Sequence, residues 1–176
     1  MNAVITSRTV LLLALITPAA WPQSPDLELA EAKGTIAGSG GDSSRVRYTI
    51  SVPKGANLHR TGEVQDVYSR PFNSFVIWQV QVEKSPVRTL EAAVKDSTIP
   101  GRRSKPEGSA VEGGFQVVLR PTSSDVVDAE VRAYKIGGSD AVRARCSGPA
   151  KALTTLIEMC STLQVLPAGS ATSSPR

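Results

Sequence analysis

Arg45-Val46-Arg47-Tyr48-Thr49-Ile50-Ser51-Val52 is the stretch that says most about the fold of this 176-residue chain. Apolar side chains occupy every second position, and polar side chains fill the positions between them. Such alternation predicts a β-strand with one face in the core and the other toward solvent. The apolar face consists of Val46, Tyr48, Ile50 and Val52. Pro53-Lys54-Gly55 then supplies residues that commonly end a strand in a turn.

Further strands are predicted downstream. Residues 75–82 are the most apolar segment and begin with apolar side chains on both faces, which is typical of a strand inside a sheet. Three more apolar segments follow, at 115–119, 127–135 and 141–146. Short connections rich in Gly, Ser and Pro separate them, which favours antiparallel hairpins.

Two helices are expected to cover this sheet. The first spans 86–95, with Val87, Leu90, Ala93 and Val94 at helical spacing. The second follows Ser147 or Gly148 as its N-cap, with Pro149 in the first helical position. Its apolar stripe is Leu153, Leu156, Ile157 and Cys160, and residues 162–165 are expected to return as an edge strand. The sequence therefore predicts an α+β fold, an antiparallel sheet of about five to six strands flanked by two helices.

The two ends of the chain, residues 1–20 and 167–176, lack the alternating apolar pattern of its middle. Residues 1–20 resemble a signal peptide, with Arg8 as the single charge, an apolar run at 10–16 and small residues at 17–20. We therefore expect a periplasmic or secreted protein. The apolar run is too short to cross a bilayer, so no transmembrane segment is expected in the mature chain. Residues 21–33 are interpreted as a lead-in with a short helical piece at 27–32, 34–166 as one globular domain, and 167–176 as a disordered tail.

Two cysteines remain after such cleavage, Cys146 and Cys160. An even number in an exported chain predicts a disulfide, because an oxidising compartment lets the bond persist. The alternative is a pair of buried free thiols. Loss of Arg8 would lower the formal net charge from +4 to +3, a mild cationic excess that suits work near anionic envelope polymers.

No residue pattern predicts a catalytic, metal or cofactor site. His59 is the only histidine, it lies in the polar stretch 56–61, and the cysteines lack metal-ligand spacing. Ser51-Val52-Pro53-Lys54 matches the S-x-x-K pattern, but that pattern works on a helix and here falls at a strand end. It leaves one alternative function open, a small periplasmic hydrolase with an unrecognised active site.

Two groups of residues are candidates for a partner surface. The first is the basic segment 101–106, with Arg102, Arg103 and Lys105, which could dock an anionic polymer. Nucleic acid is not expected as that polymer, because the sequence predicts an exported protein. The segment also has no aromatic residues between its cations on which bases could stack. The second group is Tyr68, Arg70 and Phe72, since aromatic residues and arginine dominate binding hot spots. The alternatives are a solvated loop for the first group and a Phe72 that closes the edge of the core for the second.

Two segments carry a family resemblance. Tyr48-Thr49-Ile50-Ser51-Val52-Pro53-Lys54-Gly55 resembles the opening strand of small exported domains of the Mog1/PsbP-like group. Residues 141–149, the amphipathic helix after them and 161–165 resemble that group's last strand and terminal helix. The resemblance implies an antiparallel sheet flanked by helices and a binding or assembly role, with no catalytic residues. We therefore expect a non-enzymatic accessory or binding domain of the bacterial envelope, with a protein or an anionic envelope component as its partner.

Overall fold

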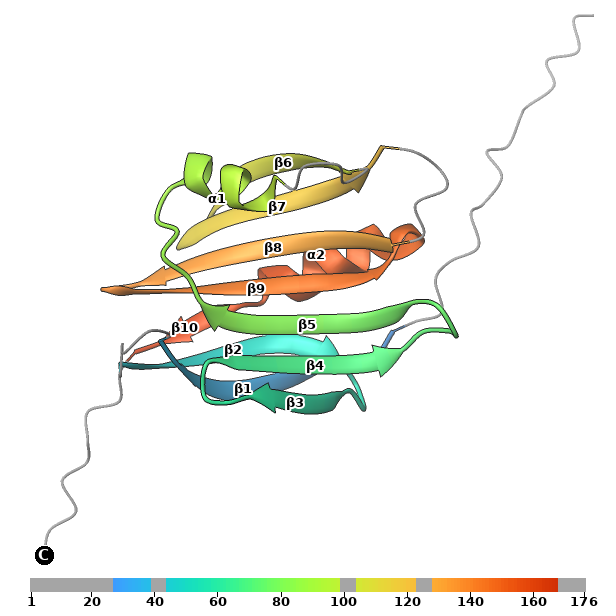
Figure 1. Cartoon of the computed structure of the whole chain (residues 1–176), viewed down its shortest axis with the longest axis horizontal. Coiled ribbons are helices and arrows are strands. Elements are labelled where there is room, and N and C mark those ends of the chain that lie inside the picture. Colours follow the sequence, from blue (N-terminus) through green and yellow to red (C-terminus); the bar gives the residue numbers. More distant parts are fainter. Residues whose placement is uncertain (1–26, 39–43, 99–103, 123–127, 168–176) are drawn as a thin grey trace, which may run out of the picture.

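A computed structural model describes residues 27–38, 44–98, 104–122 and 128–167. These residues form ten strands in two antiparallel sheets, with two short α-helices (Figure 1). The expected α+β fold, with one sheet of five to six strands and two flanking helices, is therefore wrong. The protein is mostly β, and the additional strands come from segments that sequence patterning assigned to loops or to a helix.

The larger sheet has seven strands in the order β3-β4-β5-β9-β8-β7-β6. It consists of two meanders joined where β9 pairs with β5. The first meander is β3 (Asn57–Thr61), β4 (Gln65–Pro71) and β5 (Ile77–Lys84). The second is β6 (Ser104–Val111), β7 (Gly114–Pro121), β8 (Asp128–Gly137) and β9 (Asp140–Pro149). The prediction that the most apolar segment lies inside a sheet is confirmed, because β5 pairs with β4 and β9.

The smaller sheet has three strands in the order β1-β2-β10. Its strands are β1 (Leu29–Ala37), β2 (Arg45–Pro53) and β10 (Gln164–Leu166). The predicted alternation in β2 is confirmed, because its four apolar side chains are all buried. The predicted terminal edge strand is confirmed as β10, which pairs with β2 in register Val165↔Tyr48.

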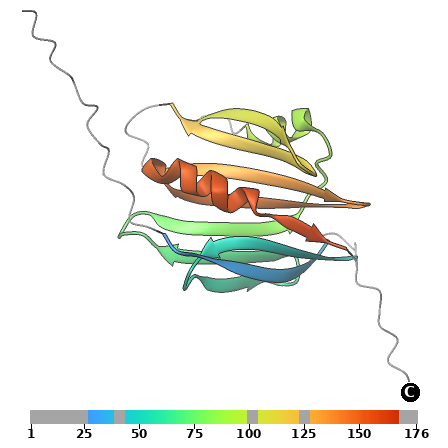
Figure 2. The same cartoon turned by 180° about the vertical axis from the view of Figure 1, so that it is seen from behind.

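The helices lie on opposite faces of the larger sheet (Figure 2). α1 (Leu90–Ser97) starts at Thr89, whose hydroxyl accepts from the Ala92 N–H, and it lies over β6 and β7. The 3₁₀ turn η1 (Ala150–Ala152) leads into α2 (Leu153–Ser161), which packs on β8 and β9. The smaller sheet shares the α2 face, and the two together cover the main core.

That core lies between the larger sheet and the layer formed by α2 and β2. Tyr48, Val80, Val131, Leu156 and Met159 are each 0% exposed within it. A second, smaller core lies under α1, on the other face of the larger sheet. Its buried members are Val87, Ala93, Val117, Leu119 and Tyr134.

Cys146 and Cys160 lie at disulfide distance, with 5.9 Å between their Cα atoms, as predicted. A helix that returns along the last strand would ordinarily end far from Cys146. Here β9 continues for three residues beyond Cys146, which carries the chain forward by about 10 Å. The seven residues from Leu153 to Cys160 then carry α2 back by about 10 Å. The two displacements cancel, and the sulfur atoms meet.

Several local predictions are corrected by the strand pairing. Residues 29–32 belong to β1 and not to a helix, because they pair with the end of β2. The segment 147–149, expected to cap and start the second helix, continues β9 instead, and Pro149 is its last residue. The polar segments around His59 and Lys105 are not loops but the edge strands β3 and β6. Each is held by hydrogen bonds to an inner strand, so neither needs an apolar face.

The predicted signal peptide at 1–20 and almost all of the predicted tail at 167–176 lie outside the described residues. Of the helices in the described part of the chain, none is long and apolar enough to span a membrane.

Candidate functional site

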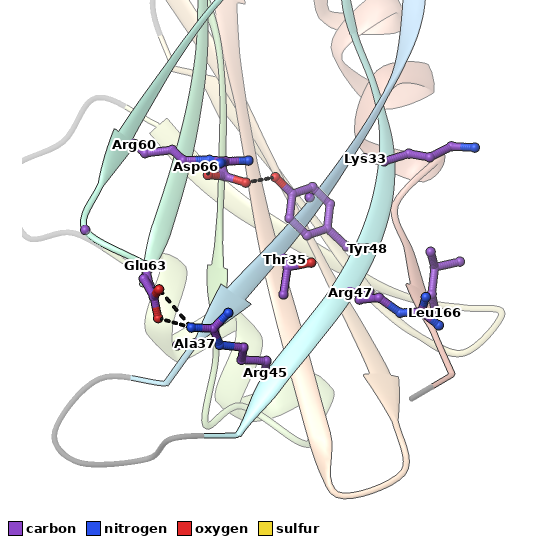
Figure 3. Close-up of a pocket in the computed structure, with 12 residues that line it drawn as sticks. Lys33, Thr35, Ala37, Arg45, Arg47, Tyr48, Arg60, Glu63, Asp66 and Leu166 are labelled. Atoms are coloured by element: carbon purple, nitrogen blue, oxygen red, sulfur yellow. Dashed lines mark hydrogen bonds and ion pairs between the residues drawn. The ribbon is translucent and has the colours of Figure 1, made fainter. Parts of the chain in front are cut away.

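A cleft of about 450 Å³ opens where β1 and the start of β2 meet the β3–β4 turn (Figure 3). Its volume falls within the range of small-molecule sites. We call it the cationic cleft, because four of its side chains are basic and two are acidic. The charged residues are Lys33, Arg45, Arg47, Arg60, Glu63 and Asp66, and the others include Gly34, Thr35, Tyr48 and Leu166.

A buried hydrogen-bond chain forms one wall of the cleft. The Tyr48 hydroxyl donates to Asp66 Oδ2 at 2.6 Å, and the Tyr68 hydroxyl lies 3.1 Å from the Tyr48 oxygen. Because Tyr48 gives its proton to a carboxylate, Tyr68 is the donor in the second bond. Burial, together with the bond to Asp66, raises the pKa of Tyr48 well above its usual value. Tyr48 therefore stays protonated and acts as a structural donor.

Ion pairs occupy most of the basic side chains. Arg60 Nε donates to Asp66 Oδ1 at 3.0 Å, and Arg45 donates to both oxygens of Glu63, at 2.7 and 2.8 Å. Lys33 pairs with Glu31 at 2.8 Å. Arg47 differs: it donates to the Pro167 carbonyl at 2.7 Å and has no carboxylate partner among the described residues. One guanidinium charge at the cleft is therefore not neutralised by an acid.

The pairing of β1 with β2 decides which side chains share a face. In register, Lys33 lies opposite Thr49, Thr35 opposite Arg47, and Ala37 opposite Arg45. These residues therefore stand on the outer face of the smaller sheet, while Gly34 and Tyr48 stand on its inner face. Figure 3 shows Lys33 and Arg47 extending to the side away from Asp66. The outer face presents Arg47 to solvent, and the inner face holds the strand in place through Tyr48.

Gly34 permits the close approach of β1 to this hydrogen-bond chain. A Cβ atom at Gly34 would lie 2.4 Å from Tyr48 Cζ and 2.5 Å from Asp66 Oδ2. Both neighbours are buried and hydrogen-bonded to each other, so neither can move without loss of that bond. Glycine is required here by space alone, since its φ is not in the left-handed region.

We expect Gly34→Ala to destabilise the fold by about 1–3 kcal/mol, the usual cost of overpacking a core. Urea denaturation measures this cost, and Thr35→Ala is the matched control, because it removes atoms from the neighbouring residue without crowding Tyr48. Equal stability of Gly34→Ala and the unsubstituted protein would show that Tyr48 and Asp66 can make room for the methyl group.

The structure does not bring the predicted partner-surface residues together. Tyr68 is 5% exposed and bonded to Tyr48, so it belongs to the core. Phe72 is half-buried, packs edge-on against Trp78 at 6.2 Å between ring centroids, and lies under the Lys151 ammonium at 5.2 Å. Arg70 is exposed and donates to the Lys54 carbonyl. Lys105 is exposed on β6, at the far edge of the sheet, while Arg102 and Arg103 lie outside the described residues.

The candidate Ser51–Lys54 pair is not assembled either. Ser51 lies within β2, opposite Glu31, whereas Lys54 lies in the following turn and is ion-paired with Glu28 at 2.7 Å. His59 is exposed on β3. Within 27–38, 44–98, 104–122 and 128–167, no group of three or more His, Cys, Asp or Glu side chains could hold a metal ion.

A second charged cluster lies beside α1, on the other face of the larger sheet. Glu130 is 1% exposed and accepts from Arg132 Nε at 2.7 Å and from Arg145 at 3.0 Å. Arg132 also donates to the Asp96 carbonyl at 2.8 Å. Burial opposes ionisation of Glu130, but the bonds from Arg145 and Arg132 outweigh it and lower its pKa to about 2. This cluster is internally paired, so we assign it to stability.

No protein-family model matches this chain, and no curated protein matches it.

Proposed function

We propose that this chain is an exported, non-enzymatic binding domain that holds an anionic group of an envelope component in the cationic cleft. The observation that carries the proposal is Arg47, whose guanidinium is exposed and has no carboxylate partner in the described chain. Its cross-strand neighbour Thr35 offers a hydroxyl on the same face. An arginine presents a planar pair of donors that matches a carboxylate or phosphate, so an anion can bind there through two parallel hydrogen bonds.

The hydrogen-bond chain that forms one wall of the cleft favours a binding role over a catalytic role in proton transfer. Tyr48 is held protonated, and Asp66 accepts from both Tyr48 and Arg60. Groups used in this way fix the geometry of a site but do not exchange protons with a substrate. The resemblance of residues 48–55, and of residues 141–165, to exported Mog1/PsbP-like domains also implies a binding role, and export itself stays part of the proposal.

The test is a titration of the purified protein with sodium phosphate and with sodium citrate at constant ionic strength, followed by amide NMR shifts. We expect saturable shifts confined to residues 33–37 and 45–49. Arg47→Gln should weaken the affinity about tenfold or more, because it removes a charge-assisted bidentate contact.

Arg70→Gln is the matched control, since Arg70 is also an exposed arginine bonded to a carbonyl, but it lies at the other end of β4. Its affinity for both anions should equal that of the unsubstituted protein. Absence of saturable shifts, or the same loss of affinity in both variants, would contradict the proposal.

A further inference from the structure

The end of the molecule opposite the cationic cleft concentrates exposed apolar side chains. Five large apolar side chains are exposed in the described residues, and four lie at this end. Leu29 starts β1, Leu58 is the second residue of β3, Ile77 starts β5, and Phe75 lies in the β4–β5 turn. The fifth, Val111, ends β6 at the other end of the sheet.

Phe75 is the most exposed of these, at 94%. Phe75 lies in the turn formed by residues 72–76. Backbone–backbone hydrogen bonds and hydrogen bonds to the Asn73 side chain both close this turn. The Phe72 and Asn73 N–H groups donate to the Val76 carbonyl, and the Asn73 side chain accepts from the N–H groups of Phe75 and Val76 at 2.8 Å. Phe72 and Val76 pack inward, while Phe75 points out of a well-bonded turn. We call residues 72–76 the aromatic tip.

Two basic side chains lie beside the aromatic tip. Arg70 donates to the Lys54 carbonyl, Lys151 lies over the Phe72 ring, and neither has a carboxylate partner among the described residues. Three exposed acids lie at this end within the same residues. Glu28 is paired with Lys54, Glu31 is paired with Lys33, and Asp128 lies on β8, two strands away from β5. An exposed aromatic ring with cations behind it is complementary to an apolar layer under an anionic surface.

We propose that the aromatic tip inserts into the headgroup region of a membrane that contains anionic phospholipid, with Phe75 and Ile77 in the apolar layer and Arg70 and Lys151 at the phosphates. Burial of an exposed aromatic side chain supplies the apolar part of the attraction, and each basic residue near an anionic surface adds to it. A protein partner would require a pocket for a protruding ring, whereas a bilayer accepts a convex tip. The proposal is independent of the anion site at Arg47.

The test uses Phe75→Trp as a depth probe in the whole chain. With vesicles of phosphatidylethanolamine and phosphatidylglycerol, we expect a blue shift of its emission and quenching by lipids brominated in the upper acyl chain. The unsubstituted protein, which contains Trp21 and Trp78, gives the baseline. Vesicles of phosphatidylcholine alone should bind both proteins more weakly than the anionic vesicles do. Added salt should reduce the binding to the anionic vesicles.

Co-sedimentation with the same vesicles separates the two contributions. Phe75→Ala and the double variant Arg70→Gln, Lys151→Gln should each lower the partition coefficient about tenfold, the second only on anionic vesicles. Val111→Ala and Lys135→Gln are the controls at the other end of the larger sheet, where Lys135 of β8 donates to the Glu112 carbonyl. Both should partition like the unsubstituted protein. Unshifted emission of Phe75→Trp, equal losses in the controls, or Phe75-dependent self-association without vesicle binding would overturn the proposal. Phosphate binding at Arg47, measured separately, would be unaffected by that outcome.

Discussion

Glu130→Gln is expected to lower the free energy of unfolding at neutral pH by about 3–5 kcal/mol, the usual cost of breaking a buried ion pair. Arg132, 4% exposed, would lose its closest acid, and the new amide would direct N–H donors at a guanidinium. Glu107→Gln is the matched control. It removes a carboxylate that pairs with Arg120 on an exposed surface, so its cost should be below about 1 kcal/mol. Urea denaturation of the two variants makes the comparison.

The same carboxylate is expected to set part of the acid sensitivity of the fold. The pKa of Glu130 falls from 4.5 to about 2 on folding, so the native state binds its proton less readily. Its stabilisation is therefore complete above about pH 4.5 and is lost as pH falls toward 2. The shift corresponds to about 3 kcal/mol at its maximum. Stability measured from pH 6 to pH 2 should fall less steeply in Glu130→Gln than in the unsubstituted protein, and parallel curves would contradict this assignment.

Removal of the Cys146–Cys160 bond is the second change with a large expected effect. The two residues are separated by 14 positions, and a loop of this size is worth about 3 kcal/mol in the unfolded chain. The double variant Cys146→Ala, Cys160→Ala should lose about this much in urea denaturation. Both side chains are fully buried, so lost packing adds to the entropic part.

Reductant provides the control for the disulfide. It should destabilise the unsubstituted protein and leave the double variant unchanged. A thiol count on denatured, unreduced protein isolated from its own cells adds a test of export, because a bond formed in an oxidising compartment leaves no free thiol. Two reactive thiols in that protein would contradict the bond.

Sequence patterning found the strands that bury several apolar side chains and missed those that do not. β4 was missed although one of its faces is buried, because that face holds Asp66 and Tyr68 and is not an apolar run. The alternation in β2 and the apolar run in β5 predict their strands because period-two burial is visible in the side chains. β3 is exposed along its whole length, so it carries no such period. β1 begins with Leu, Ala and Glu, which favour a helix in isolation, but its pairing with β2 overrides that local preference.

The cationic cleft was beyond sequence reasoning for a related reason. Tyr48 and Asp66 are 18 residues apart, on strands of different sheets, and they meet only because β1 and β2 pack against β4. Arg47 looked like any polar residue on the outer face of a strand. A signal was present in Gly34, a glycine inside an otherwise regular strand, which often marks a close approach by another group.

β2 runs from the cationic cleft toward the aromatic tip, so the length of this strand fixes the distance between the two sites. Pro53 lies six positions after Arg47, which is about 20 Å of extended chain. A molecule seated on a bilayer by Phe75 would stand upright and hold Arg47 at roughly that height, beyond the lipid phosphates and outside most of their screened field. At that height, the arginine would meet soluble or polymeric anions of the surrounding space before it met the lipids below.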